Sequence, residues 1–320
     1  MVVTTSRPFR VSLPRFIMLA ASIFLFVGLG ALAAEQITGR AECVRTFFRG
    51  PGAFCLVFLA TLEFSLARLV VRQFAEGEPL QPAWFLIMLS GGCHMASALC
   101  VQILSVNSAL NPLSGGVGAG PDATLSALYR FGIVVGGPMH MLLLAAGLGW
   151  MLRMCRRSGF VLRFDRTNWL LLAIAGLEVY FELSFLRQAS GQGLTAYDAV
   201  MALNGPLLIL LLIEANLVRS YMSKPGGGLI AKCWSTFSAA IFLSTVASLG
   251  MWMNVSGYLT PALASITWYV WFLSAAAYAL APAWQIEAIQ SACGEIGVSR
   301  FSPVATSLSA LRLLNTARSQ

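Results

Sequence analysis

The chain has 320 residues, of which 58% are hydrophobic and 11% are charged, and its formal net charge is +8. A soluble domain carries about 25% charged residues, so this composition excludes an ordinary soluble protein and predicts an all-α polytopic membrane protein. The sequence also lacks a P-loop, GxGxxG, GxSxG and HExxH. An enzyme is therefore the less favoured class.

Eight apolar stretches are long enough to cross a bilayer, whose hydrocarbon core of about 30 Å needs about 20 helical residues. The connections between them are mostly short, so little chain is left for a domain outside the membrane. We expect a basic N-terminal segment at 1–15, a bundle of eight transmembrane helices within 16–287, and a polar tail at 288–320. The predicted spans are 16–34, 51–71, 83–106, 129–152, 168–187, 199–219, 231–254 and 262–285.

Lysine and arginine residues indicate the orientation, because they favour cytoplasmic loops. With the N-terminus inside, 15 of the 21 lie in inner segments, five lie in outer segments, and Arg68 lies within a span. Both termini are therefore predicted to be cytoplasmic, in a plasma or inner membrane. The positive charge is explained by topology and gives no reason to expect a nucleic-acid partner. The bilayer and a small solute or ion are the expected partners, and a homo-oligomer is compatible with the sequence.

The first span also resembles a signal peptide, since it has basic residues, an apolar stretch and an A-x-A site at Ala31–Ala33. Its removal would leave seven spans and an external N-terminus, the topology of a receptor or sensor. The apolar run of about 19 residues is longer than the 7–15 of a signal peptide. We therefore expect the span to be retained, with the seven-span receptor or sensor as an alternative.

Two short stretches suggest an internal repeat. LEFSLARL (62–69) and IEANLVRS (213–220) share an aliphatic-Glu-x-small polar-Leu-x-Arg pattern, and Glu63 and Glu214 are 151 residues apart. Four crossings return the chain to its starting side, so this offset predicts two parallel four-helix halves. Parallel repeats of this kind occur among transporters.

Ionisable residues in the middle of the spans are the candidate functional residues. Four of them lie 10 to 12 residues into four different predicted spans, which puts them near the bilayer centre at 1.5 Å per residue. A charged side chain facing lipid there costs about 2.5 kcal/mol or more, so we expect all four to face the protein interior. The four are Glu63, His94, His140 and Glu178, and Glu182 joins them one turn from Glu178.

The helix faces agree with an interior position, because each histidine and Glu63 continues a stripe of small residues that permits close helix approach. Neighbouring antiparallel spans should then bring the two imidazoles together. Arg68 is expected either to pair with Glu63 or to extend to the membrane surface, while Glu214 and Asp198, nearer the membrane edges, are supporting candidates. The stripes are Gly132, Gly136 and His140, then Gly91, His94 and Ala98, then Ala60, Glu63 and Ala67.

Two functions fit such an interior. Carboxylates and neutral imidazoles suit a proton relay, which predicts a proton- or cation-coupled transporter without a cofactor. Alternatively, His94 and His140 could bind haem b or a Cu or Zn ion in a membrane redox protein. Glu178 and Glu182 would repel one another if both were charged, so this pair calls for a shared proton or a cation.

Overall fold

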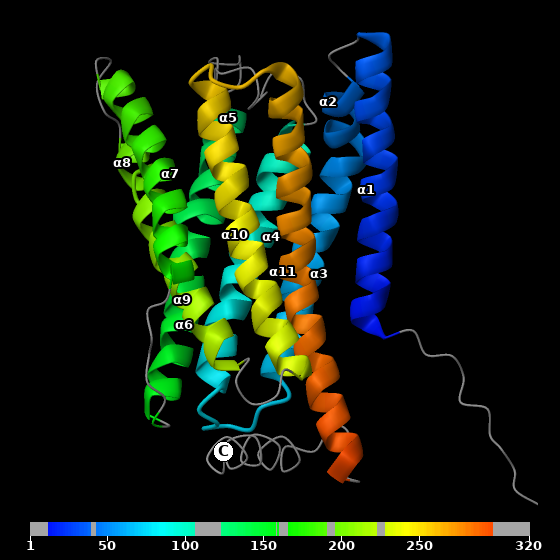
Figure 1. The fold of residues 1–320 in the computed structure, drawn as a ribbon, viewed down its shortest axis with the longest axis vertical. Coiled ribbons are helices and arrows are strands. Elements are labelled where there is room, and N and C mark those ends of the chain that lie inside the picture. The colour runs from blue at the N-terminus through cyan, green and yellow to red at the C-terminus, as the bar shows by residue number, and fades with distance from the viewer. Residues whose placement is uncertain are drawn as a thin grey trace, which may run out of the picture.

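The computed structural model describes residues 12–39, 43–105, 123–157, 159, 166–190, 196–222 and 228–296. Over these ranges the chain forms helices and no strand, and its long helices run side by side in one bundle (Figure 1). This confirms the predicted all-helical bundle. The helices are α1 (Leu13–Thr38), α2 (Cys43–Phe47), α3 (Ala53–Val71), α4 (Gln81–Ser105), α5 (Ala123–Val134), α6 (His140–Arg157), α7 (Arg166–Ser190), α8 (Ala196–Met201), α9 (Asn204–Met222), α10 (Leu229–Val255) and α11 (Pro261–Ile296).

Among the described residues, seven helical segments are long and apolar enough to cross a membrane. The remaining long helix, α7, has 25 residues but is less apolar, because it carries Glu178, Glu182 and two arginines. Large hydrophobic side chains such as Phe26, Phe54 and Trp169 are exposed on the outside of the bundle. An apolar exterior of this kind is typical of a multi-pass membrane protein.

One π-helical turn interrupts the predicted span 129–152, and another lies at the start of the predicted span 51–71. The segment η3 (Val135–Met139) joins α5 to α6, and η1 (Phe48–Gly52) joins α2 to α3. Each turn contains a proline, Pro138 or Pro51, which lacks the backbone N–H that a regular helix needs. The π turn of η3 ends directly before His140, so it sets the direction in which that imidazole leaves the helix.

The last helix is longer than predicted. It continues to Ile296 and thus passes both the expected end of the span at 285 and the expected start of the tail at 288. The polar residues of this stretch suggested a surface tail, but Ile286 and Ile289 are buried against the core. Apolar contacts one turn apart therefore keep this end of α11 helical and packed.

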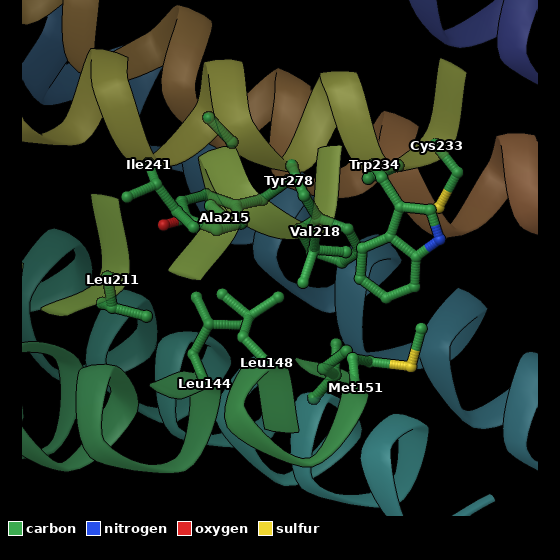
Figure 2. Packing of buried hydrophobic residues seen from close by; sticks show 14 of the residues in the cluster. Leu144, Leu148, Met151, Leu211, Ala215, Val218, Cys233, Trp234, Ile241 and Tyr278 are labelled. Carbon is green, nitrogen blue, oxygen red and sulfur yellow. The ribbon is translucent and has the colours of Figure 1, made fainter. Parts of the chain in front are cut away.

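The main core lies between α4, α6, α9, α10 and α11. Figure 2 shows side chains of α6 and α9 pointing toward those of α10, with Leu144, Leu211 and Ile241 among them. A second cluster packs α1, α2 and α3 against α11 through aromatic residues, including Phe48 and Phe272. These two clusters fix the helices that carry the polar side chains.

The first helix is attached to the bundle by polar contacts as well as apolar ones. The buried carboxylate of Glu35 accepts hydrogen bonds from the Val44 N–H, at 3.1 Å, and from the Ser265 hydroxyl, at 3.4 Å. The Tyr269 hydroxyl donates to the Gly28 carbonyl at 2.7 Å. The helix that resembles a signal peptide is thus joined to both α2 and α11.

The glycine stripe before His140 allows α4 to approach very closely. A Cβ atom on Gly132 would lie 2.7 Å from Cys100 Cβ, and one on Gly136 would overlap the Ser97 side chain. A Cβ on Gly176 of α7 would meet nothing within 4 Å. The predicted small-residue face is therefore a tight contact between helices, whereas Gly176 lies in open surroundings.

We expect Gly136→Ala to destabilise the protein, because the added methyl group must push α4 and η3 apart. Overpacking of this kind costs about 1–3 kcal/mol. Thermal unfolding in detergent micelles, followed by circular dichroism, would measure it. Gly176→Ala is the matched control and should leave the unfolding temperature unchanged or slightly raised, since alanine favours helix over glycine. Equal unfolding temperatures for the two variants would contradict the close contact.

Candidate functional site

A carboxylate and an imidazole form an ion pair inside the bundle. Nδ1 of His94 in α4 lies 2.6 Å from Oε2 of Glu63 in α3, with the Glu63 side chain 3% exposed and that of His94 19% exposed. A carboxylate can only accept a hydrogen bond, so the His94 Nδ1–H is the donor. Charge-assisted bonds of this length are the strong ones among protein hydrogen bonds.

The second histidine is fixed by the same helix α4. Nδ1 of His140 lies 3.0 Å from the Ser90 carbonyl oxygen and 2.8 Å from its hydroxyl oxygen, while that hydroxyl donates to the His140 carbonyl at 3.1 Å. A carbonyl oxygen accepts only, so the proton belongs on Nδ1. Nε2 of His140 is then left with a lone pair that can accept a proton or bind an ion.

The two imidazoles lie against each other, and a tyrosine covers both. The ring centres of His94 and His140 are 5.3 Å apart, and the Tyr278 ring of α11 lies edge-on to them at 5.9 Å and 5.6 Å. Ser274, one turn before Tyr278 on α11, hydrogen bonds with the Ser244 hydroxyl of α10 at 2.6 Å. The site is therefore built from four helices, α3, α4, α6 and α11, and α10 lies next to it.

Small residues make this geometry available. Ala60 and Ala67, one turn on either side of Glu63, are both fully buried. A Cβ on Gly91 would lie 3.3 Å from the Phe64 Cα and 3.5 Å from the Glu63 Cγ. The backbones of α3 and α4 thus approach closely at this level, which lets the short Glu63 side chain reach His94.

The remaining two carboxylates form a separate cluster. Glu178 Oε1 accepts from the Ser248 hydroxyl at 2.7 Å, and Glu182 Oε2 accepts from the Gly205 N–H at 3.0 Å. Both glutamates are buried, and within the described residues Glu178 Oε2 and Glu182 Oε1 have no hydrogen-bond partner. Gly205 is the second residue of α9, where a helix terminus favours negative charge. This pair thus faces the protein interior as expected, but on other helices than those that hold the histidines.

The supporting residues behave differently from one another. Arg68 is exposed in the last turn of α3 and forms no ion pair in the described part of the chain, which fits the second of its two alternatives, extension to the membrane surface. His94 is the partner of Glu63 instead, because its ring lies directly across the tight contact between α3 and α4. Glu214 lies beside Gly149, away from both clusters. The Asp198 side chain lies outside the described residues.

Several side chains of the candidate site could not be identified from charge, because they are uncharged. Ser90 orients His140, and Tyr278 covers both imidazoles. Ser248 of α10 donates to Glu178, and Ser244, one turn before it, hydrogen bonds with Ser274 of α11. A hydroxyl group within an otherwise apolar span is the only signal that points to them, since buried polar groups need partners.

Across the described residues, no three His, Cys, Asp or Glu side chains come together in an arrangement that could hold a metal ion. The two histidines alone could contribute two nitrogen ligands. Both have Nδ1 held by a neighbour, which is how metal-binding histidines are commonly oriented.

Comparisons with known proteins assign no family. The chain matches no protein-family model, no curated protein and no solved structure. The chemistry of the two polar clusters is therefore the basis for any functional proposal.

A double-mutant cycle should reveal strong coupling between Glu63 and His94. Glu63→Leu or His94→Leu alone leaves one buried polar partner unpaired, and breaking a buried pair costs about 3–5 kcal/mol. The double variant should cost clearly less than the sum, because neither partner is then stranded. Unfolding free energies in detergent micelles would measure the cycle.

The matched control combines Glu63→Leu with Glu182→Leu, a residue of the other cluster. Substitutions without shared partners add within about 0.5 kcal/mol. Additivity for Glu63 and His94 as well would show that their short contact contributes nothing to stability.

Proposed function

We propose that the protein is a multi-pass membrane transporter in which protonation of Glu63, His94 and His140 is coupled to the movement of a small solute or cation. The observation that carries the proposal is the Glu63–His94 pair at 2.6 Å, which contacts a second imidazole inside a bundle of apolar helices. Ionisable groups in such positions are costly and commonly mark ion or proton pathways.

A route for protons can be traced between the two clusters. The imidazoles of His94 and His140 contact Tyr278 of α11, and Ser274, one turn before it on the same helix, hydrogen bonds with Ser244 of α10. One turn further along α10, Ser248 donates to Glu178. Hydroxyl groups both donate and accept hydrogen bonds, so this series supports a relay. Glu182, one turn from Glu178, would accept or release protons at its end.

The helix contacts support the proposal of eight spans in two parallel halves. In this arrangement α3 corresponds to α9, α4 to α10, and the helix ending in α6 to α11. Accordingly, α3 packs on α4 and α11, and α9 packs on α10 and α6. The halves differ at their first helices, since α1 packs on α11 of the other half, whereas α7 packs on α9 and α10 of its own half. We propose that α7 crosses the membrane as the first helix of the second half.

The orientation follows from the distribution of basic residues. The start of α1 and the end of α11 lie at the same end of the bundle (Figure 1), as two cytoplasmic termini require. We propose that this end faces the cytoplasm in a plasma or inner membrane. A seven-span receptor would need α1 to be removed, and the contacts of Glu35 and Tyr269 with α1 favour its retention.

We expect Glu63→Gln to abolish coupled flux while leaving the fold intact, because glutamine keeps the side-chain shape but cannot carry the proton. The purified protein would be placed in liposomes that enclose a pH-sensitive dye. Amino acids, sugars, carboxylic acids, Na⁺ and divalent cations would then be added outside, one class at a time. A coupled transporter changes the internal pH only when the class of solute that it carries is added. Glu63→Gln should reduce the rate of this pH change at least about tenfold, which corresponds to 1.4 kcal/mol.

Glu35→Gln is the matched control, since it neutralises a buried carboxylate outside the two clusters and should retain the flux. If Glu63→Gln and Glu178→Gln both kept wild-type flux at every pH, the relay would be disproved and these residues would be structural.

A metal-binding membrane protein is the second candidate, and the spacing of the two imidazoles is the observation that favours it. Two imidazoles on one tetrahedral ion, at about 2.0–2.1 Å per bond, place their ring centres roughly 5 Å apart. The observed 5.3 Å fits a single Cu or Zn ion, and Nε2 of both rings would bind it. This spacing favours one small ion over a haem as the group bound by His94 and His140.

Elemental analysis of the purified protein separates the two candidates. We expect no stoichiometric Fe, Cu or Zn and no visible absorption, because the transporter needs only the exchangeable protons of the site. His94→Ala, His140→Ala and a Ser244→Ala control would be measured in parallel. A stoichiometric metal that is lost in both histidine variants and kept in Ser244→Ala would replace the transporter with the metal protein.

A further inference from the structure

A small cavity opens between α6 and α9, away from the polar clusters described above. Its volume is about 260 Å³, and its lining residues are Gly149, Leu152, Arg153, Arg156 and Glu214. Pockets for drug-sized molecules are larger, about 300–1,000 Å³. The cavity therefore suits a small, charged group.

The charges in this cavity are separated instead of paired. Glu214 forms no ion pair with either arginine in the described part of the chain, and its buried Oε2 has no hydrogen-bond partner there. The other oxygen, Oε1, lies over Gly149, 3.1 Å from where a Cβ atom would be. A buried carboxylate without a partner is costly, so this oxygen calls for a donor that the described helices do not supply.

The two arginines lie nearer the end of the helix than the carboxylate does. Gly149, beside Glu214, is eight residues from the end of α6 at Arg157, or about 12 Å at 1.5 Å per residue. Arg153 is one turn closer to that end, and Arg156 is in the last turn. Both arginines are exposed, and the Arg153 guanidinium lies 5.9 Å from the Trp150 ring centre. Tryptophan and arginine together are typical of the membrane–water interface.

We propose that this cavity binds a primary ammonium joined to a phosphate by a short linker, as in the headgroup of phosphatidylethanolamine. The ammonium would donate to the Glu214 carboxylate at the deep end. The phosphate would accept from Arg153 and Arg156 at the rim, where guanidinium groups bind phosphate with two parallel hydrogen bonds.

The charge order of the cavity selects this chemistry over other lipid headgroups. A choline headgroup carries a quaternary ammonium, which has no N–H to donate to Glu214. A glycerol headgroup offers hydroxyl donors but no cation to balance the charge of Glu214. A serine headgroup has an ammonium, but it also brings a second carboxylate that Glu214 would repel. The cavity contains neither of the histidines and needs no proton coupling, so lipid binding there does not depend on the proposed function.

Lipid binding by the delipidated full-length protein tests the proposal. Native mass spectrometry would compare dioleoyl phosphatidylethanolamine with the phosphatidylcholine and phosphatidylglycerol of the same chains. We expect the ethanolamine lipid to bind at least tenfold more tightly than either. Free phosphoethanolamine would be added as a competitor, to distinguish a lipid headgroup from a soluble ligand of the same chemistry.

Variants assign the binding to this cavity. Glu214→Gln should remove the preference for ethanolamine over choline, and Arg153→Gln with Arg156→Gln should weaken the binding of all three lipids. Gly149→Leu would fill the cavity without changing its charge and should abolish the preference too. Arg157→Gln, which changes a neighbouring arginine that does not line the cavity, should bind as the wild type does.

Free phosphoethanolamine could displace the bound lipid at concentrations too low to change the stability of the protein. This result would support the proposed chemistry and indicate a soluble ligand. Equal affinity for ethanolamine and choline lipids would overturn the proposal. So would tighter binding of phosphatidylglycerol, or an unchanged ethanolamine preference in both Glu214→Gln and Gly149→Leu.

Discussion

The arrangement of the bundle depends on one ion pair that has to be satisfied without water. Glu63 and His94 lie 2.6 Å apart among helices whose other residues are mostly apolar, so each must stay with its partner or be left as an isolated buried charge. This requirement fixes the relative height and rotation of α3 and α4. Ser90 lies one turn from His94 on α4 and holds the His140 imidazole of α6. The constraint therefore extends from α4 to α6.

Much of this could be predicted from the sequence, because a helix repeats every 3.6 residues and a charged group at the bilayer centre has to avoid lipid. Those two facts placed His94 and His140 on facing small-residue stripes. Gly136 and Ser97 are indeed in direct contact, and the rings are adjacent. The long helices could be predicted as well, since each long apolar stretch of the sequence forms one.

Periodicity could not predict which helix covers a given face. Glu178 and Glu182 are buried as expected, but α9 and α10 cover them instead of α3 and α4. Whether Arg68 or His94 is the partner of Glu63 also depends on the distance between α3 and α4. The sequence of one helix gives no information on that distance. Tyr278 carries no charge at neutral pH and sits in a stretch that hydropathy treats as ordinary core.

Helix α10 lies between the two polar clusters and contacts residues on both sides. Ser244 hydrogen bonds with Ser274 of α11, one turn from Tyr278, and Ser248 donates to Glu178. A small rotation of this one helix would therefore break or restore both contacts together. A packed helix moves between discrete arrangements more readily than it deforms continuously. The Ser244–Ser248 face of α10 is therefore one physical link between the two clusters among the described residues.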